Sequence, residues 1–201
     1  MNQQLDKNIM NFEKFAGCFV QELQNCLNEV QIDQVKEAVE MIKEAYRQDK
    51  QIFFIGNGGS ASTASHFATD LAKGVAIEGK RRFRALSLTD NVAMISAIGN
   101  DIGFEEVFSE QLRPLLQRGD LVIVISASGN SPNIVNAVKF SKSKGALVLG
   151  IVGFGGGTVQ SIADQSIILN SQHYGHVETV HLFLEHLIVH YFMEVLKFDE
   201  N

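Results

Sequence analysis

The chain has 201 residues, a length that predicts one domain, or one domain with a helical extension. Hydrophobic residues make up 45% and charged residues 20%, and 23 acidic against 17 basic residues argue against a protein that mainly binds nucleic acid or anionic lipid. Two cysteines are too few for a disulfide framework, and no apolar run is long enough to span a bilayer. The acidic N-terminal segment does not resemble a secretory signal, so we expect a cytoplasmic protein without a membrane partner.

The N-terminal quarter has the pattern of two amphipathic helices. Between about Asn8 and Tyr46, apolar residues recur at spacings of three and four, with a break near 31–33. The first stripe comprises Phe12, Phe15, Phe19 and Leu23, and the second comprises Val35, Val39, Ile42 and Ala45. Such stripes are typical of packing surfaces. We therefore expect residues 1–48 to form a helical hairpin that packs against a partner subunit.

After Lys50, short apolar runs alternate with helical stretches. The runs predict five strands, at 51–55, 83–88, 121–125, 146–152 and 165–169. Helices are expected near 60–74, 91–99, 104–117, 131–144, 157–163 and 176–197. This alternation predicts an α/β core over 50–197, with a parallel sheet covered by helices on both faces, in a single domain spanning 1–201. Ligands of such folds bind beyond the carboxyl ends of the strands.

The first strand leads into a loop rich in glycine and serine, Gly56–Ser62, and a helix follows. Glycines let the backbone approach an anion, the helix N-terminus directs free N–H groups at it, and Ser60 can cap the helix or offer its hydroxyl. A tight strand-to-helix turn explains the same residues without any ligand. The loop lacks the lysine of a Walker phosphate loop, and Ala61 stands where the dinucleotide fingerprint requires glycine.

A second loop of this kind, Ser126–Asn133, follows the third strand and opens another helix, with Pro132 suited to the first helical turn. Alone, this loop suits a capped helix start. Two such loops at one sheet edge, neither with a cation, predict a phosphate held by hydroxyls, backbone amides and helix dipoles. The glycines at 153–157 are interpreted as a flexible turn, and the basic run at 80–84 as a solvated lead-in to a strand.

The loops Gly56-Asn-Gly-Gly-Ser60 and Ser126-Ala-Ser-Gly-Asn-Ser131 resemble the loop pair of the sugar isomerase (SIS) domain. From about Gln51 to Leu196 the chain resembles the phosphoheptose isomerases. Further shared segments lie at 65–68, 97–104 and 177–181. The resemblance implies a three-layer αβα, flavodoxin-like fold with a five-stranded parallel sheet and an N-terminal helical hairpin. It also implies interconversion of sedoheptulose 7-phosphate and D-glycero-D-manno-heptose 7-phosphate, in a homotetramer with shared active sites.

The resemblance assigns substrate-binding residues as well. It implies phosphate contacts by the serines of both loops and by the glycine backbone between them. These residues are Gly58, Gly59, Ser60, Ser126, Ser128 and Ser131. Asn57 and Asp101 match family positions near the sugar hydroxyls, and Asp101 equally suits a helix cap before Phe104.

Aldose–ketose isomerisation removes a proton beside a carbonyl and returns it one carbon away, so it needs a base, an acid partner and a group that stabilises the enediolate. His66 and Asp70 are four residues apart and share a helix face. The last helix carries Glu178, His181, Glu185 and His186. By resemblance, His66, Asp70, Glu178 and His186 line the active site and hold zinc, with Asp70 or Glu178 as the base and His186 as its acid partner. Taken singly, these residues also suit packing histidines and solvated helix acids.

Four positions differ from the family pattern. Asp70 stands where glutamate is usual, Glu178 where glutamine is usual, Ala127 where threonine is common and Gly74 where arginine is common. Aspartate is one methylene shorter than glutamate, which displaces the base, and the carboxylate of Glu178 compensates in part. Two imidazoles and two carboxylates still suit a divalent metal, with zinc expected.

A second hypothesis belongs to a different class of function. Some SIS proteins do not catalyse isomerisation; they bind a phosphosugar as regulators, or bind the replication initiator as scaffolds. Retention of His66, Glu178 and His186 favours catalysis, whereas an aspartate at position 70 favours the second hypothesis slightly. A single SIS domain argues against glucosamine synthase-type enzymes, which carry two in tandem. We expect a phosphorylated sugar and copies of this chain as partners, and no direct contact with nucleic acid.

Overall fold

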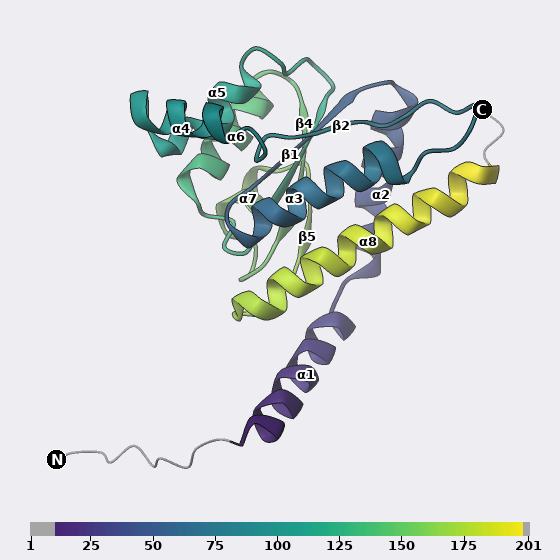
Figure 1. Ribbon diagram of the computed structural model, residues 1–201, viewed down its shortest axis with the longest axis vertical. Coiled ribbons are helices and arrows are strands. Elements are labelled where there is room, and N and C mark those ends of the chain that lie inside the picture. The colour runs from purple at the N-terminus through teal and green to yellow at the C-terminus, as the bar shows by residue number, and fades with distance from the viewer. Residues whose placement is uncertain (1–10, 199–201) are drawn as a thin grey trace.

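The computed structural model describes residues 11–198, and strands alternate with helices along them (Figure 1). The helices are α1 (Phe12–Asn28), α2 (Ile32–Arg47), α3 (Gly59–Thr69), α4 (Val92–Asp101), α5 (Val107–Leu112), α6 (Pro132–Ser143), α7 (Gly157–Ile162) and α8 (Tyr174–Phe198). The strands are β1 (Gln51–Gly56), β2 (Arg84–Ser87), β3 (Leu121–Ser126), β4 (Leu147–Val152) and β5 (Gln165–Ile168). A π-helical turn, η1 (Asp70–Gly74), follows α3, and a 3₁₀ turn, η2 (Phe104–Glu106), precedes α5. No helix of the described residues combines the length and the apolar character needed to cross a membrane.

The strands form one parallel sheet in the order β2-β1-β3-β4-β5, which confirms the predicted sheet with strand ends within one residue of expectation. Every residue of β3 is buried, as its unbroken Val/Ile/Leu run predicts. From β1 the chain passes outward to β2 and then returns to β3 on the other side of β1. This reversal is the topological switch point of a flavodoxin-like sheet, and it opens a crevice at the carboxyl ends of β1 and β3.

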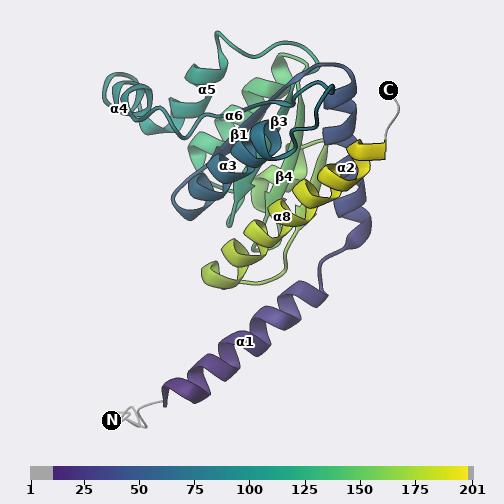
Figure 2. The ribbon, with the colours of Figure 1, turned by 45° about the vertical axis from the view of Figure 1, so that its right-hand side comes forward.

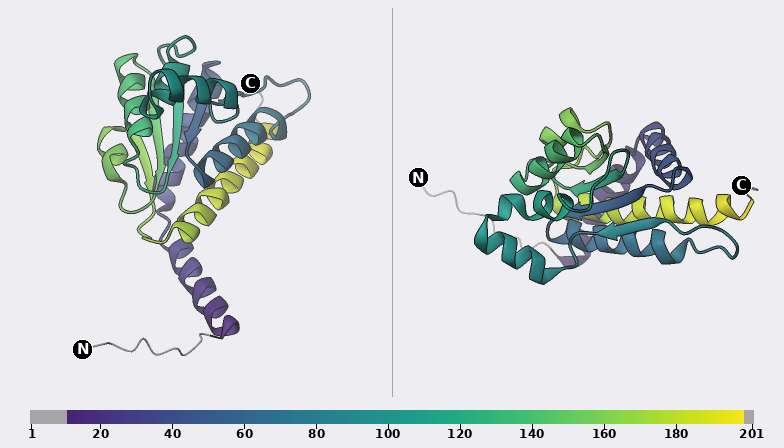
Figure 3. Two further views of the ribbon diagram at one scale, coloured as in Figure 1. Left: turned by 60° about the vertical axis from the view of Figure 1, so that its left-hand side comes forward. Right: turned by 90° about the horizontal axis from the view of Figure 1, so that it is seen from above.

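Helices cover both faces of the sheet and complete the predicted three layers (Figure 3). On one face α2, α3 and α8 pack against side chains such as Phe54 and Ile123. On the other face α4, α5, α6 and α7 pack against Phe53 and Val122. Neighbouring residues of a strand point to opposite faces, so β1 and β3 contribute to both cores. The serine loops therefore follow two central strands whose side chains are buried on both faces of the sheet.

The two N-terminal helices are present, but α1 does not fold back on α2 as a hairpin requires. It extends beyond the body of the molecule, and its C-terminal part reaches the core through Cys26 (Figure 2). In a hairpin, the apolar stripe of α1 would pack on the apolar stripe of α2. The stripe of α2, which includes Val35, Val39 and Ile42, is instead buried against the sheet. The predicted start of the first helix at Asn8 lies outside the described residues.

Two predicted helices also differ in form from a regular α-helix. The helix expected over 60–74 stops being α-helical at Thr69 and ends in η1, where Val75 N donates to the carbonyl of Asp70 (2.9 Å). The helix expected over 104–117 is a 3₁₀ turn followed by α5, which ends at Leu112. Pro114 explains the early end of α5, because proline lacks a backbone N–H and disfavours helical geometry in the residue before it.

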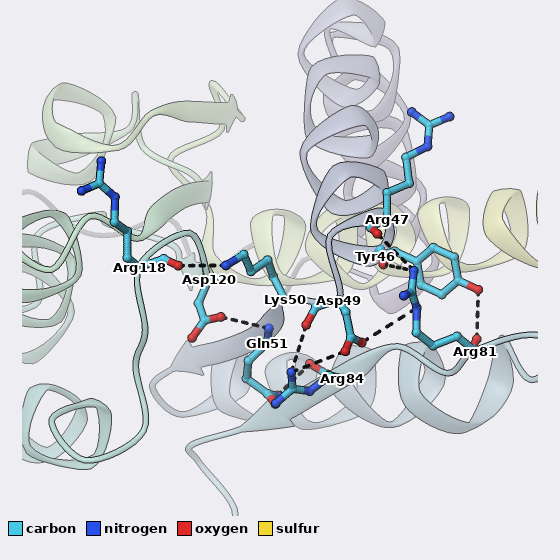
Figure 4. Close-up of polar contacts among 9 residues, drawn as sticks. All are labelled: Tyr46, Arg47, Asp49, Lys50, Gln51, Arg81, Arg84, Arg118 and Asp120. Carbon is cyan, nitrogen blue, oxygen red and sulfur yellow. Dashed lines mark hydrogen bonds and ion pairs between the residues drawn. The ribbon is translucent and has the colours of Figure 1, made fainter. Parts of the chain in front are cut away.

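The basic run before β2 lies at the amino edge of the sheet, opposite the serine loops. Arg81 Nη2 donates hydrogen bonds to the carbonyls of Tyr46 (2.7 Å) and Arg47 (3.2 Å), the last two residues of α2 (Figure 4). Arg84 Nη1 donates to the carbonyl of Asp49 (2.9 Å). The run is therefore more than a solvated lead-in, because two of its arginines anchor the loop to the end of α2.

Candidate active site

The two serine loops meet at the switch point of the sheet. One follows β1 and the other follows β3, and the parallel pairing of these strands brings both loops to one edge. With the start of α8 they enclose a cavity of about 110 Å³, lined by Asn57, Ser60, Ser126, Ala127, Ser128, Ser131, Tyr174 and Glu178. The cavity thus gathers five of the predicted substrate-binding side chains together with Glu178.

Two helices begin at this cavity. α3 starts at Gly59 after Gly58, whose φ of +55° favours glycine, and α6 starts at Pro132 after Ser131. Neither helix start has a side-chain cap, so Ser60 does not cap α3. α3 starts with Gly59 and Ser60, whose N–H groups have no helical partner and can donate to an anion in the field of the helix dipole. α6 offers fewer donors, because Pro132 has no backbone N–H and Ile134 N donates to Asn133 Oδ1 (2.9 Å). The cavity lining of the described residues contains no lysine or arginine.

Hydrogen bonds within and between the loops orient their polar groups. Asn57 and Asn133 exchange two amide hydrogen bonds of 2.9 Å, which tie one loop to the other. Ser126 Oγ accepts from Gly129 N (3.1 Å), and Ser128 Oγ accepts from Asn130 N (3.2 Å). Each of these two hydroxyls keeps its proton to donate, which is the role that a phosphate oxygen requires.

The third glycine cluster supports the second serine loop. A Cβ on Gly129, whose φ is +62°, would lie 2.1 Å from the carbonyl oxygen of Gly156, so the two backbones are in direct contact. Val159 N donates to the carbonyl of Gly129 (3.0 Å), and Thr158 N donates to Asn130 Oδ1 (2.9 Å). The glycines at 153–157 therefore form more than a flexible turn, because they allow the close approach that holds the serine loop.

Glu178 belongs to α8, and its side chain lies beside the N-terminus of α3. Its half-buried carboxylate is so close to Gly59 that a Cβ there would come within 2.6 Å of Oε2. A carboxylate at a helix N-terminus is favoured by the helix dipole, but here it also lines the cavity expected to hold phosphate. Glu178 therefore places a carboxylate in the cavity where we expect an anion to bind.

A second cluster of polar side chains lies further along α3 and α8, which run side by side (Figure 1). His66, Asp70, Glu185 and His186 each offer one ligand atom within 4.8 Å of the others. His66 Nε2 is 3.4 Å from Asp70 Oδ2, and His186 Nε2 is 3.2 Å from Glu185 Oε2. The two imidazole rings meet edge to face with centroids 5.1 Å apart. Two nitrogen and two carboxylate donors make a chemically suitable set for a divalent metal.

Asp70 is positioned by the π-helical turn. It is the first residue of η1, which widens the helix at the point where the carboxylate joins the cluster. π-Helical turns within helices frequently mark functional sites. Gly74 closes the turn, and a Cβ there would lie 3.1 Å from Met193 Cε and 3.7 Å from Asp70 Cβ. The glycine at position 74 therefore leaves room for α8 to approach Asp70.

Two buried groups on α8 have shifted protonation. Burial raises the pKa of Glu185 to about 8, and the negative charge of Asp70 adds to this effect. Burial lowers the pKa of His181 to about 4, and neither ring nitrogen of His181 has a hydrogen-bond partner among the described residues. At neutral pH the structure therefore favours a protonated Glu185 and a neutral His181.

The structure divides the predicted metal ligands between two places. Within one chain it brings His66, Asp70 and His186 together. The predicted fourth ligand, Glu178, lies at the serine-loop cavity instead, and Glu185 is the carboxylate beside the other three. Asp101, predicted near the sugar, is the exposed last residue of α4 on the opposite face of the sheet. It does not cap η2 either, because Gly103 precedes that turn.

Sequence reasoning did not assign a role to Glu185 or Tyr174. A usable signal for Glu185 was its position four residues after His181, on the face of the last helix that carries Val177 and Leu184. A carboxylate on such an apolar face has no solvent and needs a partner. Tyr174 carried no comparable signal, since it lies in the loop-like segment that the structure includes in α8.

The sheet order and the hydroxyl-lined cavity at the switch point define a doubly wound α/β protein with a candidate ligand site between its β1 and β3 loops. The sequence model of the SIS domain family matches residues 18–153. Phosphoheptose isomerase from Campylobacter concisus is 38% identical over 151 residues, covering 75% of this chain and 79% of that protein. The enzyme of the same name from Sulfurimonas denitrificans is 37% identical over 161 residues, covering 80% and 82%.

Solved structures agree with these relatives. The phosphoheptose isomerase of Neisseria gonorrhoeae superposes with a TM-score of 0.84 at 29% identity, covering 92% of this chain and all of that one. That of Francisella tularensis superposes with a TM-score of 0.81 at 25% identity, covering 91% and 98%. The chain therefore belongs to the SIS domain family and, within it, to the phosphoheptose isomerases. This membership favours the isomerase hypothesis over the regulator or scaffold hypothesis.

Proposed function

We propose that the protein is an aldose–ketose isomerase that interconverts sedoheptulose 7-phosphate and D-glycero-D-manno-heptose 7-phosphate. The observation that carries this proposal is the pairing of a hydroxyl-lined anion cavity with an imidazole–carboxylate cluster on the same two helices. Six residues separate Ser60 from His66 along α3, a rise of about 9 Å. That spacing suits a ligand with a phosphate at one end and a carbonyl several carbons away.

The serine loops bind the phosphate. Hydroxyls of Ser60, Ser126, Ser128 and Ser131 donate hydrogen bonds to its oxygens, and the N–H groups at the starts of α3 and α6 add a positive field. Asn57, held by Asn133, directs an amide toward the sugar. Because no lysine or arginine lines the cavity, recognition of the phosphate depends on how well its oxygens fit the hydroxyl and N–H donors.

Proton transfer takes place at the other end of the sugar. In the ketose-to-aldose direction, the base removes a proton from C1 and returns it to C2. The acid partner moves a hydroxyl proton from the C1 oxygen to the C2 oxygen. Asp70 and Glu178 are the candidate bases, and His186 is the acid partner. His66, Asp70 and His186 would hold a divalent metal, with zinc expected, which would supply Lewis-acid polarisation of the carbonyl when bound.

Assembly completes the proposed site. The exposed apolar residues of α1 support a homotetramer in which neighbouring chains share active sites. In such an assembly, residues of neighbouring chains line one active site, and Asp70 and His186 of one site can come from different chains. The whole chain, 1–201, acts as one SIS domain in this proposal, and cysteine usage supports a cytoplasmic location.

Turnover of the heptose phosphate tests the proposal. Purified protein, chelated or supplied with zinc, is incubated with sedoheptulose 7-phosphate while NMR follows the aldose product. We expect turnover to fall by about 10²-fold or more in Asp70→Ala and His186→Ala, because each removes a proton-transfer group. His190→Ala, an exposed histidine on the same helix, is the control. Saturable binding of the sugar phosphate without turnover, in either metal state, contradicts the proposal.

A further inference from the structure

We propose that Tyr174 binds the substrate phosphate from the α8 side of the serine-loop cavity, and that Phe154 positions its ring there. This inference deepens the proposed function and rests on phosphate binding by the serine loops. Tyr174 is the first residue of α8 and lines the cavity together with the serines of both loops. It adds a phenolic O–H group, a donor without charge, to a lining of described residues that has no lysine or arginine.

The backbone conformation of Phe154 is the first observation behind this proposal. Among the described residues, only two that are not glycine have a positive φ, Asp49 (+55°) and Phe154 (+50°). Aspartate tolerates the left-handed region, whereas a bulky phenylalanine is disfavoured there. Glycines occupy the next three positions, 155–157, and they have positive φ as well. The conformation at Phe154 is therefore strained, and strained residues cluster at ligand sites.

Backbone contacts hold Phe154 between the second serine loop and the start of α8. Gly153 N donates to the carbonyl of Ser126, and Phe154 N donates to the carbonyl of Ser171, both at 3.3 Å. Gly153 also packs tightly on α8, since a Cβ there would lie 2.6 Å from Val177 Cγ1. The loop after β4 therefore joins two elements that line the cavity.

The side chain of Phe154 contacts Tyr174. The two rings meet edge to face, with centroids 4.7 Å apart and an interplanar angle of 74°, a geometry that aromatic pairs prefer. Phe154 is partly buried against the core, whereas Tyr174 is 59% exposed. Packing on Phe154 thus fixes one side of the tyrosine ring and leaves more than half of the residue available to a ligand.

A tyrosine at this position completes a set of neutral donors. Phosphate oxygens accept hydrogen bonds from hydroxyl groups, and a hydrogen bond to an ionised acceptor is stronger than one between neutral groups. The tyrosine ring has few rotatable bonds, so a ring that Phe154 already holds loses little conformational entropy when phosphate binds. Phe154 is not part of the lining that the described residues form, so it acts on the phosphate through Tyr174.

Binding of inorganic phosphate by the full-length protein tests the role of the hydroxyl. Isothermal titration compares wild type, Tyr174→Phe and Tyr191→Phe, which removes the same group from an exposed tyrosine further along α8. We expect Tyr174→Phe to weaken phosphate binding by about tenfold. Tyr191→Phe should keep the wild-type affinity within about twofold. Equal affinities of wild type and Tyr174→Phe, or no phosphate binding by the wild type, overturn the inference.

Tyrosine fluorescence gives a second readout, because the sequence has three tyrosines and no tryptophan. Phosphate should change the emission of the wild type and of Tyr191→Phe, since Tyr174 contacts the bound anion in both. The change should be absent in Tyr174→Phe. A change of wild-type size in Tyr174→Phe contradicts the contact.

A double-mutant cycle tests whether Phe154 acts through Tyr174. Phe154→Leu removes the ring and keeps an apolar side chain, so it should weaken phosphate binding by about threefold. In Tyr174→Phe the same substitution should have no further effect, because the hydroxyl that Phe154 positions is already absent. A loss by the same factor in both backgrounds shows that Phe154 supports the loop independently, and overturns its positioning role.

Turnover of sedoheptulose 7-phosphate separates this inference from the proposed function. Tyr174→Phe should raise KM by about tenfold and leave kcat within about twofold, because the phosphate lies several carbons from the reacting carbonyl. Turnover by the wild type, with KM and phosphate affinity unchanged in Tyr174→Phe, means that the isomerase proposal holds and the inference fails. Absence of wild-type turnover, with phosphate binding that depends on the Tyr174 hydroxyl, means that the inference holds and the substrate proposal fails.

Discussion

At the scale of single residues, two carboxylates lie in different parts of the candidate site. Glu178 lines the serine-loop cavity, whereas Asp70 belongs to the imidazole–carboxylate cluster. We expect the first carboxylate to affect phosphate binding and the second to affect proton transfer. They can be measured separately, because inorganic phosphate occupies the cavity without undergoing chemistry.

Replacing Glu178 by glutamine should strengthen phosphate binding. The substitution removes a charge that repels the phosphate and leaves the hydroxyls and helix N-termini unchanged, so we expect binding tighter by about two- to fivefold, equivalent to about 0.4–1 kcal/mol. Isothermal titration with inorganic phosphate measures the effect, and Glu37→Gln on α2 controls for net charge. Weaker phosphate binding in Glu178→Gln would show that the carboxylate supports the cavity.

His181 should make the folded state sensitive to acid. The unfolded histidine binds a proton near its ordinary pKa of 6.5, whereas burial lowers the folded pKa to about 4. Between these values the unfolded state binds more protons, so stability is full above about pH 6.5 and is lost as pH falls toward 4. The shift corresponds to about 3 kcal/mol at most.

Urea unfolding at pH 7 and at pH 4.5 measures this loss. In His181→Leu, which cannot titrate, the acid-induced loss should shrink relative to the wild type. In His190→Ala, which removes an exposed histidine, it should not change. Equal acid-induced losses in wild type and His181→Leu would be incompatible with the lowered pKa.

At the scale of elements, the site depends on glycines that bring loops from different strands into contact. The second serine loop is supported by the loop after β4, through backbone contact between Gly129 and Gly156. Strands β3 and β4 are neighbours in the sheet, so their carboxyl-end loops lie side by side. The geometry of the phosphate site is therefore decided partly by a loop that contributes no residue to its lining.

Gly129→Ala should displace the serine loop. The new Cβ would lie 2.1 Å from a backbone oxygen and at a φ of +62°, so the loop must move. Misplacement of substrate by about 1 Å can reduce kcat/KM by about a hundredfold. Gly155→Ala is the matched control, since φ is +77° there but nothing lies within 4 Å of the added atom. It should cost about 1–2 kcal/mol in stability and leave KM unchanged. Equal effects of both variants on KM would refute the contact as the cause.

At the scale of the whole molecule, α1 carries apolar side chains that one chain does not bury. Phe12, Phe15 and Val20 are 77%, 51% and 55% exposed, and Phe183, Leu187 and Tyr191 form a further exposed row on α8. Large exposed apolar patches mark association surfaces. The projection of α1 away from the core is thus consistent with a helix that packs in an assembly (Figure 2).

Replacing both Phe12 and Phe15 by serine should reduce the oligomeric state. Each substitution removes an aromatic side chain from the association surface and leaves the core unchanged. Sedimentation equilibrium measures the molar mass, and Lys14→Ala on the same helix serves as the control. A monomeric wild type, or an unchanged mass for the double variant, contradicts an assembly built on α1.

The local features of this protein could be predicted from the sequence. Alternating apolar runs predicted the strands, because residues buried on both faces of a parallel sheet must be apolar along their whole length. The positions of Ser60 and Ser126 just after buried strands predicted that they would meet, because parallel strands end at one edge. The resemblance of these loops to the SIS domain identified the family. Each of these inferences depends on residues that are close together in the sequence. The spacing of apolar and polar residues within such a segment is visible in the sequence itself.

The tertiary structure decided which distant side chains meet. Whether Glu178 or Glu185 joins His66 depends on how α8 aligns against α3, and the spacing of residues within either helix does not determine that alignment. The direction of α1 likewise depends on α2 burying its apolar stripe against the sheet. Helix alignment results from packing summed over a whole interface, to which each residue contributes little. The sequence by itself therefore determined the family, the sheet and the two serine loops, and only packing decided which side chains make up the imidazole–carboxylate cluster.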